Sequence, residues 1–177
     1  MNRGSTIKKL LFSIIFLLGA IFLPHFTAKV PRLEEALIVM HIPVYLCGFV
    51  CGAPWGFVVG MVSPILRSVI FGVPGLYPDA VAMMFELAFY GLLAGAFFDV
   101  FGKAFKARRV GASYLALIVA MLGGRAVWGL VRLVMMLVGS VGITWSQFVF
   151  YAFTNEWSAI ILHLLIVPGI VAQMHRK

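Results

Sequence analysis

Five ionisable side chains lie inside long apolar segments of this 177-residue chain: Arg67, Glu86, Arg125, Arg132 and Glu156. An ionised group at bilayer depth is costly unless it faces a partner, a cavity or a ligand. Guanidinium groups can donate two parallel hydrogen bonds to a carboxylate or a phosphate. These residue types therefore indicate that the positions bind one another, a small anion, or both.

The balance of these charges favours an anionic ligand. Three arginines stand against two glutamates, which leaves one positive charge in excess when both glutamates are ionised and paired. We predict that Arg132 and Arg67 bind the anion and that aromatic side chains close over the apolar part of the ligand. The aromatic candidates are Tyr77, Tyr90, Trp128, Trp145 and Trp157.

Composition predicts an integral membrane protein. Hydrophobic residues make up 63% of the chain and charged residues 11%, and the mean hydropathy is +1.06, which leaves too little polar surface to cover a soluble globule. Runs such as Leu10–Leu18 do not alternate as a membrane β-strand would. We predict an all-α fold of six transmembrane helices in one bundle, forming a single domain over residues 1–177. The apolar stretches are 9–24, 37–53, 54–72, 80–100, 112–138 and 148–172.

Basic residues outside these stretches predict the orientation of the bundle. The segment Lys103–Arg109 and the basic residues near both ends of the chain fall on one side, whereas Lys29 and Arg32 fall on the other. We expect both termini to be cytoplasmic and the first helix to be retained rather than cleaved as a signal peptide. The net charge of +8 is then a topology signal, with contact to the lipid bilayer and no binding of nucleic acid.

Depth along the predicted helices places most of the charges in one layer. At about 1.5 Å per residue, Arg67, Glu86 and Arg132 lie roughly 7 to 12 Å below the outer surface, and so do Asn155 and Glu156. This layer predicts a binding pocket that is open to the outside. The alternative for Glu86 and Arg67 is core packing around a satisfied ion pair.

Arg125 is expected deeper, near the middle of the membrane. It lies seven residues before Arg132, so both share one helix face with Trp128, and that face should look into the bundle. Arg125 could instead hold the bundle together. On another helix, Glu86 and Tyr90 are four residues apart and form one stripe.

Signatures of catalysis are weak. Cys47 and Cys51 have a spacing that suits neither a disulfide nor a zinc site, so we expect them to be packing residues. An intramembrane hydrolase built on Ser63 or Ser68 with His163 is one alternative function, and a structural membrane subunit without a ligand is another. No catalytic or metal-binding residue is predicted, and the chain has no nucleotide-binding loop. His41 is either a ligand contact or a helix cap.

Several stretches resemble one known family. They are Met40–Phe49, Gly52–Gly56, Ser63–Ser68, Phe71–Pro74, Ala82–Gly91 and Gly124–Gly129. In this order they resemble the substrate-binding S component of energy-coupling factor (ECF) vitamin transporters, and especially the pantothenate-type subgroup, over nearly the whole chain. The resemblance implies a multi-pass protein of a prokaryotic plasma membrane that is not an enzyme. Its partners would be a transmembrane coupling subunit and two cytoplasmic ATPases, which hydrolyse ATP and release the vitamin inward by toppling the S component.

Pantothenate is the first choice of substrate because excess intramembrane arginine suits its carboxylate; folate, pyridoxine and a thiamine precursor are alternatives. The predicted substrate-binding residues are Arg67, Tyr77, Glu86, Tyr90, Arg125, Trp128, Arg132, Asn155 and His41. The chain departs from the family on its first helix, where Phe12–Leu17 lacks the small-xxx-small motif with two alanines that docks the coupling subunit. The small residues available there are Ser13, Gly19 and Ala20.

Overall fold

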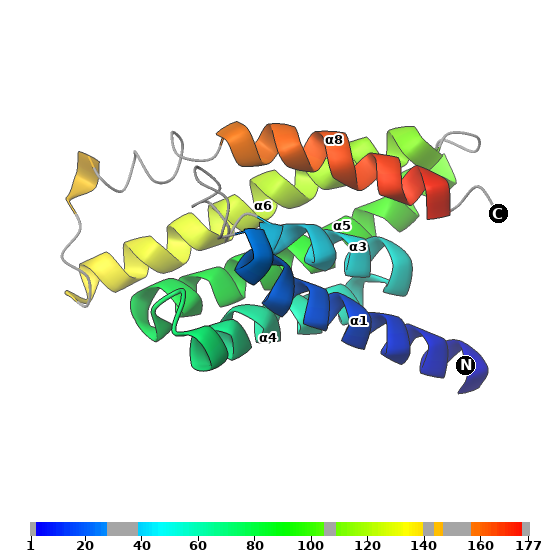
Figure 1. The fold of residues 1–177 in the computed structure, drawn as a ribbon. Coiled ribbons are helices and arrows are strands. Elements are labelled where there is room, and N and C mark those ends of the chain that lie inside the picture. The colour runs from blue at the N-terminus through cyan, green and yellow to red at the C-terminus, as the bar shows by residue number, and fades with distance from the viewer. Residues whose placement is uncertain (1–2, 28–38, 105–108, 140–143, 147–156, 175–177) are drawn as a thin grey trace.

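The computed structural model describes residues 3–27, 39–104, 109–139, 144–146 and 157–174 (Figure 1). The described chain folds into six α-helices and one wide turn. They are α1 (Arg3–Thr27), α3 (His41–Cys51), α4 (Ala53–Phe71), the turn η1 (Leu76–Ala80), α5 (Val81–Ala104), α6 (Arg109–Leu137) and α8 (Trp157–Met174). The prediction of an all-helical fold with six helices is confirmed, since each helix overlaps one predicted apolar stretch.

Within the described residues, four segments are long and apolar enough to cross a membrane: Gly4–Thr27, Ala53–Phe71, Leu76–Ala104 and Val110–Leu137. The described parts of the other two helices are shorter. At about 1.5 Å per residue, α3 rises only about 16 Å. The predicted start of the last helix, at 148–156, lies outside the described residues.

Helix α5 occupies the middle of the bundle and packs against α3, α4 and α6 (Figure 1). Helix α1 packs on α3 and α4, and α8 packs on α6 and α3. The start of α1 and the end of α8 lie at one end of the bundle, while η1 and the end of α6 lie at the other. Every helix therefore has a defined neighbour, and α5 joins the two halves.

Glycines bring the backbones of α3, α4 and α5 into direct contact. A Cβ atom on Gly56 would lie 2.6 Å from the Gly91 carbonyl oxygen, and one on Gly60 would lie 2.1 Å from the Leu87 carbonyl oxygen. No side chain fits at such separations, so these positions require glycine for close approach, as is common between membrane helices. We call this contact the glycine seam; it consists of Gly48, Gly56, Gly60, Gly91 and Gly95.

A single glycine turns the chain between α3 and α4. Gly52 has φ of 97°, a value that side-chain-bearing residues rarely adopt, and it is the sole residue between the two helices. Its amide donates to the Gly48 carbonyl at 3.0 Å. Helices α3 and α4 consequently fold back on each other and bring Gly48 close to Gly56.

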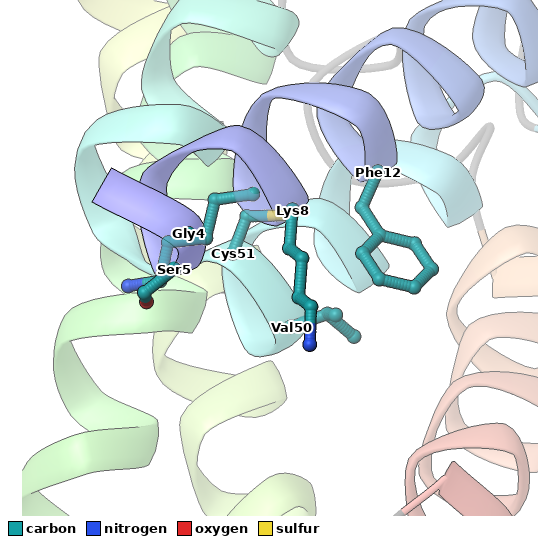
Figure 2. A pocket seen from close by; sticks show the side chains of 7 residues that line it. Gly4, Ser5, Lys8, Phe12, Val50 and Cys51 are labelled. Atoms are coloured by element: carbon teal, nitrogen blue, oxygen red, sulfur yellow. The ribbon is translucent and has the colours of Figure 1, made fainter. Parts of the chain in front are cut away.

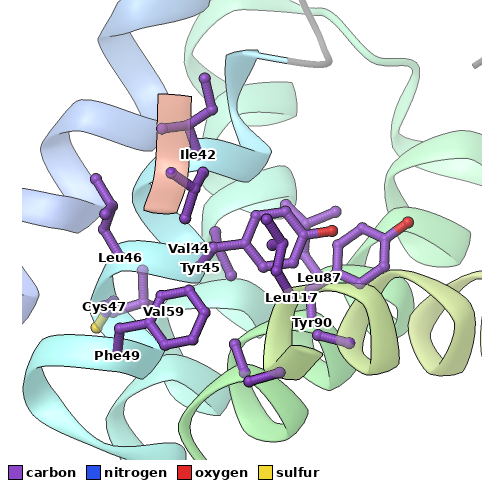
Figure 3. Packing of buried hydrophobic residues seen from close by; sticks show 14 of the residues in the cluster. Ile42, Val44, Tyr45, Leu46, Cys47, Phe49, Val59, Leu87, Tyr90 and Leu117 are labelled. Carbon is purple, nitrogen blue, oxygen red and sulfur yellow. The ribbon is translucent and has the colours of Figure 1, made fainter. Parts of the chain in front are cut away.

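The apolar core lies where α3, α5 and α6 meet (Figure 3). Tyr45 and Val44 of α3 pack with Leu87 of α5 and Leu117 of α6, and each of these side chains is fully buried. Cys47 belongs to the same core. Cys47 and Cys51 are both buried free thiols, which confirms the prediction that they are packing residues.

Small residues on α1 face the interior of the protein. Cys47 Sγ lies 3.6 Å from Ser13 Oγ, to which it donates, and Ser13 is buried. A Cβ atom on Gly19 would lie 3.5 Å from Cγ of Pro43 on α3. The close helix approach that these small residues permit is therefore used within the chain, between α1 and α3.

Candidate functional site

Two ion pairs meet at a tryptophan between η1, α5 and α6. Arg125 Nη1 lies 3.4 Å from Glu86 Oε1, and Arg132 Nη2 is bonded to Asp79 Oδ1. The guanidinium carbons of Arg125 and Arg132 lie 5.1 Å and 5.5 Å from the ring centroid of Trp128. We call these five residues the arginine–tryptophan site.

The sequence spacing on α6 creates this arrangement. Arg125, Trp128 and Arg132 are three and four residues apart, so they stand on successive turns of one helix face. Trp128 is buried, which confirms the prediction that this face looks into the bundle. A cation over an indole ring gains about 0.5 to 2 kcal/mol, and the gain is larger when water is excluded.

Glu86 is the most buried acid of the site, with 2% of its surface exposed. Tyr90, one helical turn further along α5, donates its hydroxyl hydrogen to Glu86 Oε1 at 2.7 Å. The predicted stripe of Glu86 and Tyr90 is therefore confirmed. Because an isolated carboxylate is costly at this depth, the hydroxyl of Tyr90 and the guanidinium of Arg125 together stabilise it.

A missing side chain on α6 makes room for this tyrosine. A Cβ atom on Gly124 would lie 2.2 Å from Cδ1 of Tyr90 and 3.0 Å from the Glu86 carbonyl oxygen. Gly124 directly precedes Arg125, so the same turn of α6 that presents the guanidinium also admits the phenol ring. Gly124 is thus a positioning residue for the Glu86 and Tyr90 pair.

A buried cluster of aromatic rings extends from Tyr90 toward α3 and α8. The His41 ring lies 5.4 Å from Tyr90 and 5.6 Å from His163, measured between centroids. Tyr45 lies 5.0 Å from Tyr90 and 5.4 Å from His163. These contacts place His41, a predicted site residue, beside Tyr90, and its contact with a ligand stays a prediction.

Three residues of this assembly are absent from the predicted site: Asp79, Tyr45 and His163. Tyr45 carried a usable signal, because it lies one helical turn after His41 and shares its face. Asp79 lies in a turn rich in proline and glycine, where spacing does not indicate which way a side chain points. His163 can be aligned by spacing only with residues of its own helix, so its contacts with α3 are not predictable.

Arg67 has a different set of contacts. It is buried, its Nη1 donates to the Ile21 carbonyl of α1 at 2.8 Å, and its guanidinium carbon lies 5.5 Å from the Phe71 ring. Pro24 lies three residues after Ile21 in α1; it has no amide hydrogen, and its ring disturbs the hydrogen bonds of the preceding turn. Arg67 therefore stabilises the proline-containing turn of α1 and fastens it to α4.

The remaining predicted positions lie at the surface or outside the described chain. Tyr77 is 53% exposed and Trp145 is 62% exposed. Asn155 and Glu156 lie outside the described residues, and so does the side chain of Trp157. The proposed contact of Asn155 with a ligand stays a prediction.

Serine chemistry finds no support in this geometry. Ser63 Oγ donates to the carbonyl of Gly60 at 3.4 Å within its own helix, a common role for serine in a membrane helix. His163 lies instead against the rings of His41 and Tyr45. The arrangement has the properties of a binding site, with cations, one deeply buried acid and aromatic faces, rather than those of a nucleophile with its base.

A cleft of about 500 Å³ lies apart from these residues, between the first turns of α1 and the end of α3 (Figure 2). Its lining residues are Gly4, Ser5, Lys8, Lys9, Phe12, Val50 and Cys51. Both lysines are exposed. The cleft contains none of the residues of the arginine–tryptophan site, and it lies at the end of the bundle where α1 begins.

Comparison with protein families gives one match. A sequence model described as "ECF transporter, substrate-specific component" matches residues 6–171, which include all six helices except the first three residues of α1 and the last three of α8. No curated protein and no solved structure gives a significant match.

Proposed function

Because the chain belongs to the family of substrate-specific components of ECF transporters, we propose that it captures a small anionic vitamin, with pantothenate as the first choice. Membership of this family makes the chain a multi-pass membrane protein that binds a transport substrate and is not an enzyme. Members pair with a coupling subunit and with ATPase subunits. The proposal adds the chemical class of the substrate and the residues that bind it.

The arginine–tryptophan site carries this proposal. Arg132 lies near the end of α6 beside the half-exposed Asp79, and the proposal takes this end of the bundle as the one that faces the outside. Arg125 and the deeply buried Glu86 lie further inside. A guanidinium at the entrance followed by acidic, phenolic and imidazole groups suits a ligand with a carboxylate at one end and hydroxyl or amide groups at the other.

Pantothenate has this distribution of groups. Its carboxylate would bind Arg132, while its hydroxyl and amide groups would exchange hydrogen bonds with Glu86, Tyr90 and His41. Trp128 would contact the carbon chain between them. Arg125 would act mainly through Glu86, and Tyr77, Arg67 and Asn155 are proposed as further contacts from the sequence alone.

Other vitamins make different demands on the same residues. Folate also carries carboxylates but is much larger, whereas pyridoxine and a pyrimidine precursor of thiamine carry none. Binding of an uncharged vitamin would depend on the aromatic groups and on Glu86, and it would be insensitive to removal of Arg132. This dependence separates the candidates.

For transport, we propose that η1 and the end of α6 face the outside and that both termini are cytoplasmic, in the plasma membrane of a prokaryotic cell. The chain would form one domain over residues 1–177. A transmembrane coupling subunit and two cytoplasmic ATPases would drive inward release by toppling the chain in the membrane. The ATPases hydrolyse ATP, so no cofactor is assigned to this chain.

The direct test is identification of the bound molecule. The protein is purified in detergent, small molecules that copurify are identified by mass spectrometry, and a panel of vitamins is then titrated by calorimetry. The proposal predicts tight binding of pantothenate without turnover, and a large loss of affinity in Arg132→Ala. Binding of an uncharged vitamin with unchanged affinity in Arg132→Ala would replace pantothenate, and no binding of any vitamin would refute the proposal.

A further inference from the structure

The contact between Arg132 and Asp79 joins a buried cation to an exposed anion. The side chain of Arg132 is 10% exposed, whereas that of Asp79 is 51% exposed. One nitrogen, Nη2, meets one carboxylate oxygen, Oδ1. Arg132 Nε is buried and has no hydrogen-bond partner among the residues that the structure describes. Asp79 therefore neutralises the charge of Arg132 but accepts a hydrogen bond from Nη2 alone, which leaves the Nε donor on the same edge of the guanidinium unsatisfied.

A ligand carboxylate can satisfy that edge more completely. Nε and Nη2 of a guanidinium point in parallel and suit the two oxygens of one carboxylate. A buried donor without a partner is destabilising, so a second hydrogen bond at Nε would improve on the present pairing. The position of Asp79 is restrained by its turn, which the 2.9 Å bond from the Ala80 amide to the Gly75 carbonyl closes.

We propose that Asp79 holds the place of the substrate's carboxylate at Arg132 and gives it up when the substrate binds. The inference rests on the proposed function in requiring a ligand with a carboxylate. Asp79 is half exposed, so its carboxylate can turn to water at little cost. Arg132 keeps its position over Trp128 during the exchange, because that contact does not involve Asp79.

The exchange serves the empty and the loaded protein in different ways. A buried guanidinium without an anion is strongly destabilising, and Asp79 prevents this in the empty state. Asp79 also competes with the substrate for Arg132. The apparent affinity for the substrate is therefore the intrinsic affinity multiplied by the fraction of time that Arg132 is free of Asp79. An uncharged analogue would gain nothing from displacing Asp79, so the pair selects for a carboxylate.

The experiment compares Asp79→Asn with the unchanged protein in calorimetric titrations of pantothenate and of its neutral alcohol, pantothenyl alcohol. If Asp79 occupies Arg132 about nine-tenths of the time, D79N should bind pantothenate about tenfold more tightly. Affinity for the alcohol should stay the same. Asp79→Ala removes the carboxylate without adding an amide and should give the same gain. Asp99→Asn, at an exposed position on α5, is the matched control and should bind as the unchanged protein does.

Failure of this inference can be told apart from failure of the proposed function. If the unchanged protein binds pantothenate and D79N binds it equally or more weakly, Asp79 is not a competitor and the inference is wrong. If the unchanged protein binds no vitamin, propionate, which carries only the carboxylate, and its uncharged analogue propionamide are used instead. A thermal denaturation assay then measures how much each compound stabilises the protein. The exchange is supported if propionate stabilises D79N at lower concentrations than it stabilises the unchanged protein and if propionamide stabilises neither. Equal responses of the two proteins to propionate overturn it.

Discussion

Arg125 Nη1 lies 3.4 Å from Glu86 Oε1 across the interface of α6 and α5. The two side chains are 17% and 3% exposed, so the pair is buried between two helices that are long and apolar enough to cross a membrane. Burial makes each charge depend on the other, since removing one partner leaves the second without compensation. This dependence gives the first prediction.

Glu86→Gln and Arg125→Met should each lower the free energy of unfolding by about 3 to 5 kcal/mol, because each leaves one buried charge unpaired. The double variant should lose less than the sum of the single losses, since it leaves neither charge behind. Reversible unfolding of the four proteins in detergent measures this coupling. Additive losses would show that the pair contributes nothing as a pair.

Arg132→Ala and Arg67→Ala should differ in what they change. Loss of Arg132 should reduce pantothenate affinity by on the order of 2 to 5 kcal/mol, because a paired charge at the ligand is removed. Loss of Arg67 should mainly lower stability, by about 1 to 3 kcal/mol, because the Ile21 carbonyl loses its donor. Calorimetry on the folded fraction separates the two effects. An equal loss of affinity in both variants would place Arg67 at the ligand, as the sequence predicts.

Gly124→Ala should weaken ligand binding, because the added methyl group meets the ring of Tyr90 and displaces its hydroxyl from Glu86. Gly123→Ala is the matched control. Its added methyl group meets only the flexible Leu93 side chain, which can rotate away, so affinity should be kept. Titration of both variants with pantothenate decides the matter. Equal affinities would show that Tyr90 does not depend on Gly124.

Gly56→Ala should destabilise the protein by about 1 to 3 kcal/mol or more, because its Cβ would meet backbone atoms that cannot rotate away. Those atoms are the Gly91 carbonyl and the Gly48 Cα, at 2.6 Å and 2.8 Å. Gly169→Ala on α8 has open space around its Cβ and should be neutral or slightly stabilising. Thermal unfolding of the two variants tests the glycine seam. Equal melting temperatures would contradict the backbone contact.

Helix number and type could be read from the sequence because hydrophobic length is a strong and local signal. The shared face of Arg125, Trp128 and Arg132 followed from spacing for the same reason. The sequence does not predict which acidic side chain pairs with which arginine. Depth along the helices separates Arg125 from Glu86, because depth follows backbone positions and does not include the reach of a long side chain. Asp79 was missed because its turn has no period from which a direction could be derived.

The glycine seam also determines which parts of the molecule can move. Contacts between backbones offer no alternative rotamers, so α3, α4 and α5 can neither slide nor separate in small steps. By contrast, α6 meets Glu86 and Asp79 through the side chains of Arg125 and Arg132, and side chains have alternative rotamers. Admission of a solute should therefore be accommodated by side chains between α6, α5 and η1, while the backbones of the three glycine-packed helices keep their positions.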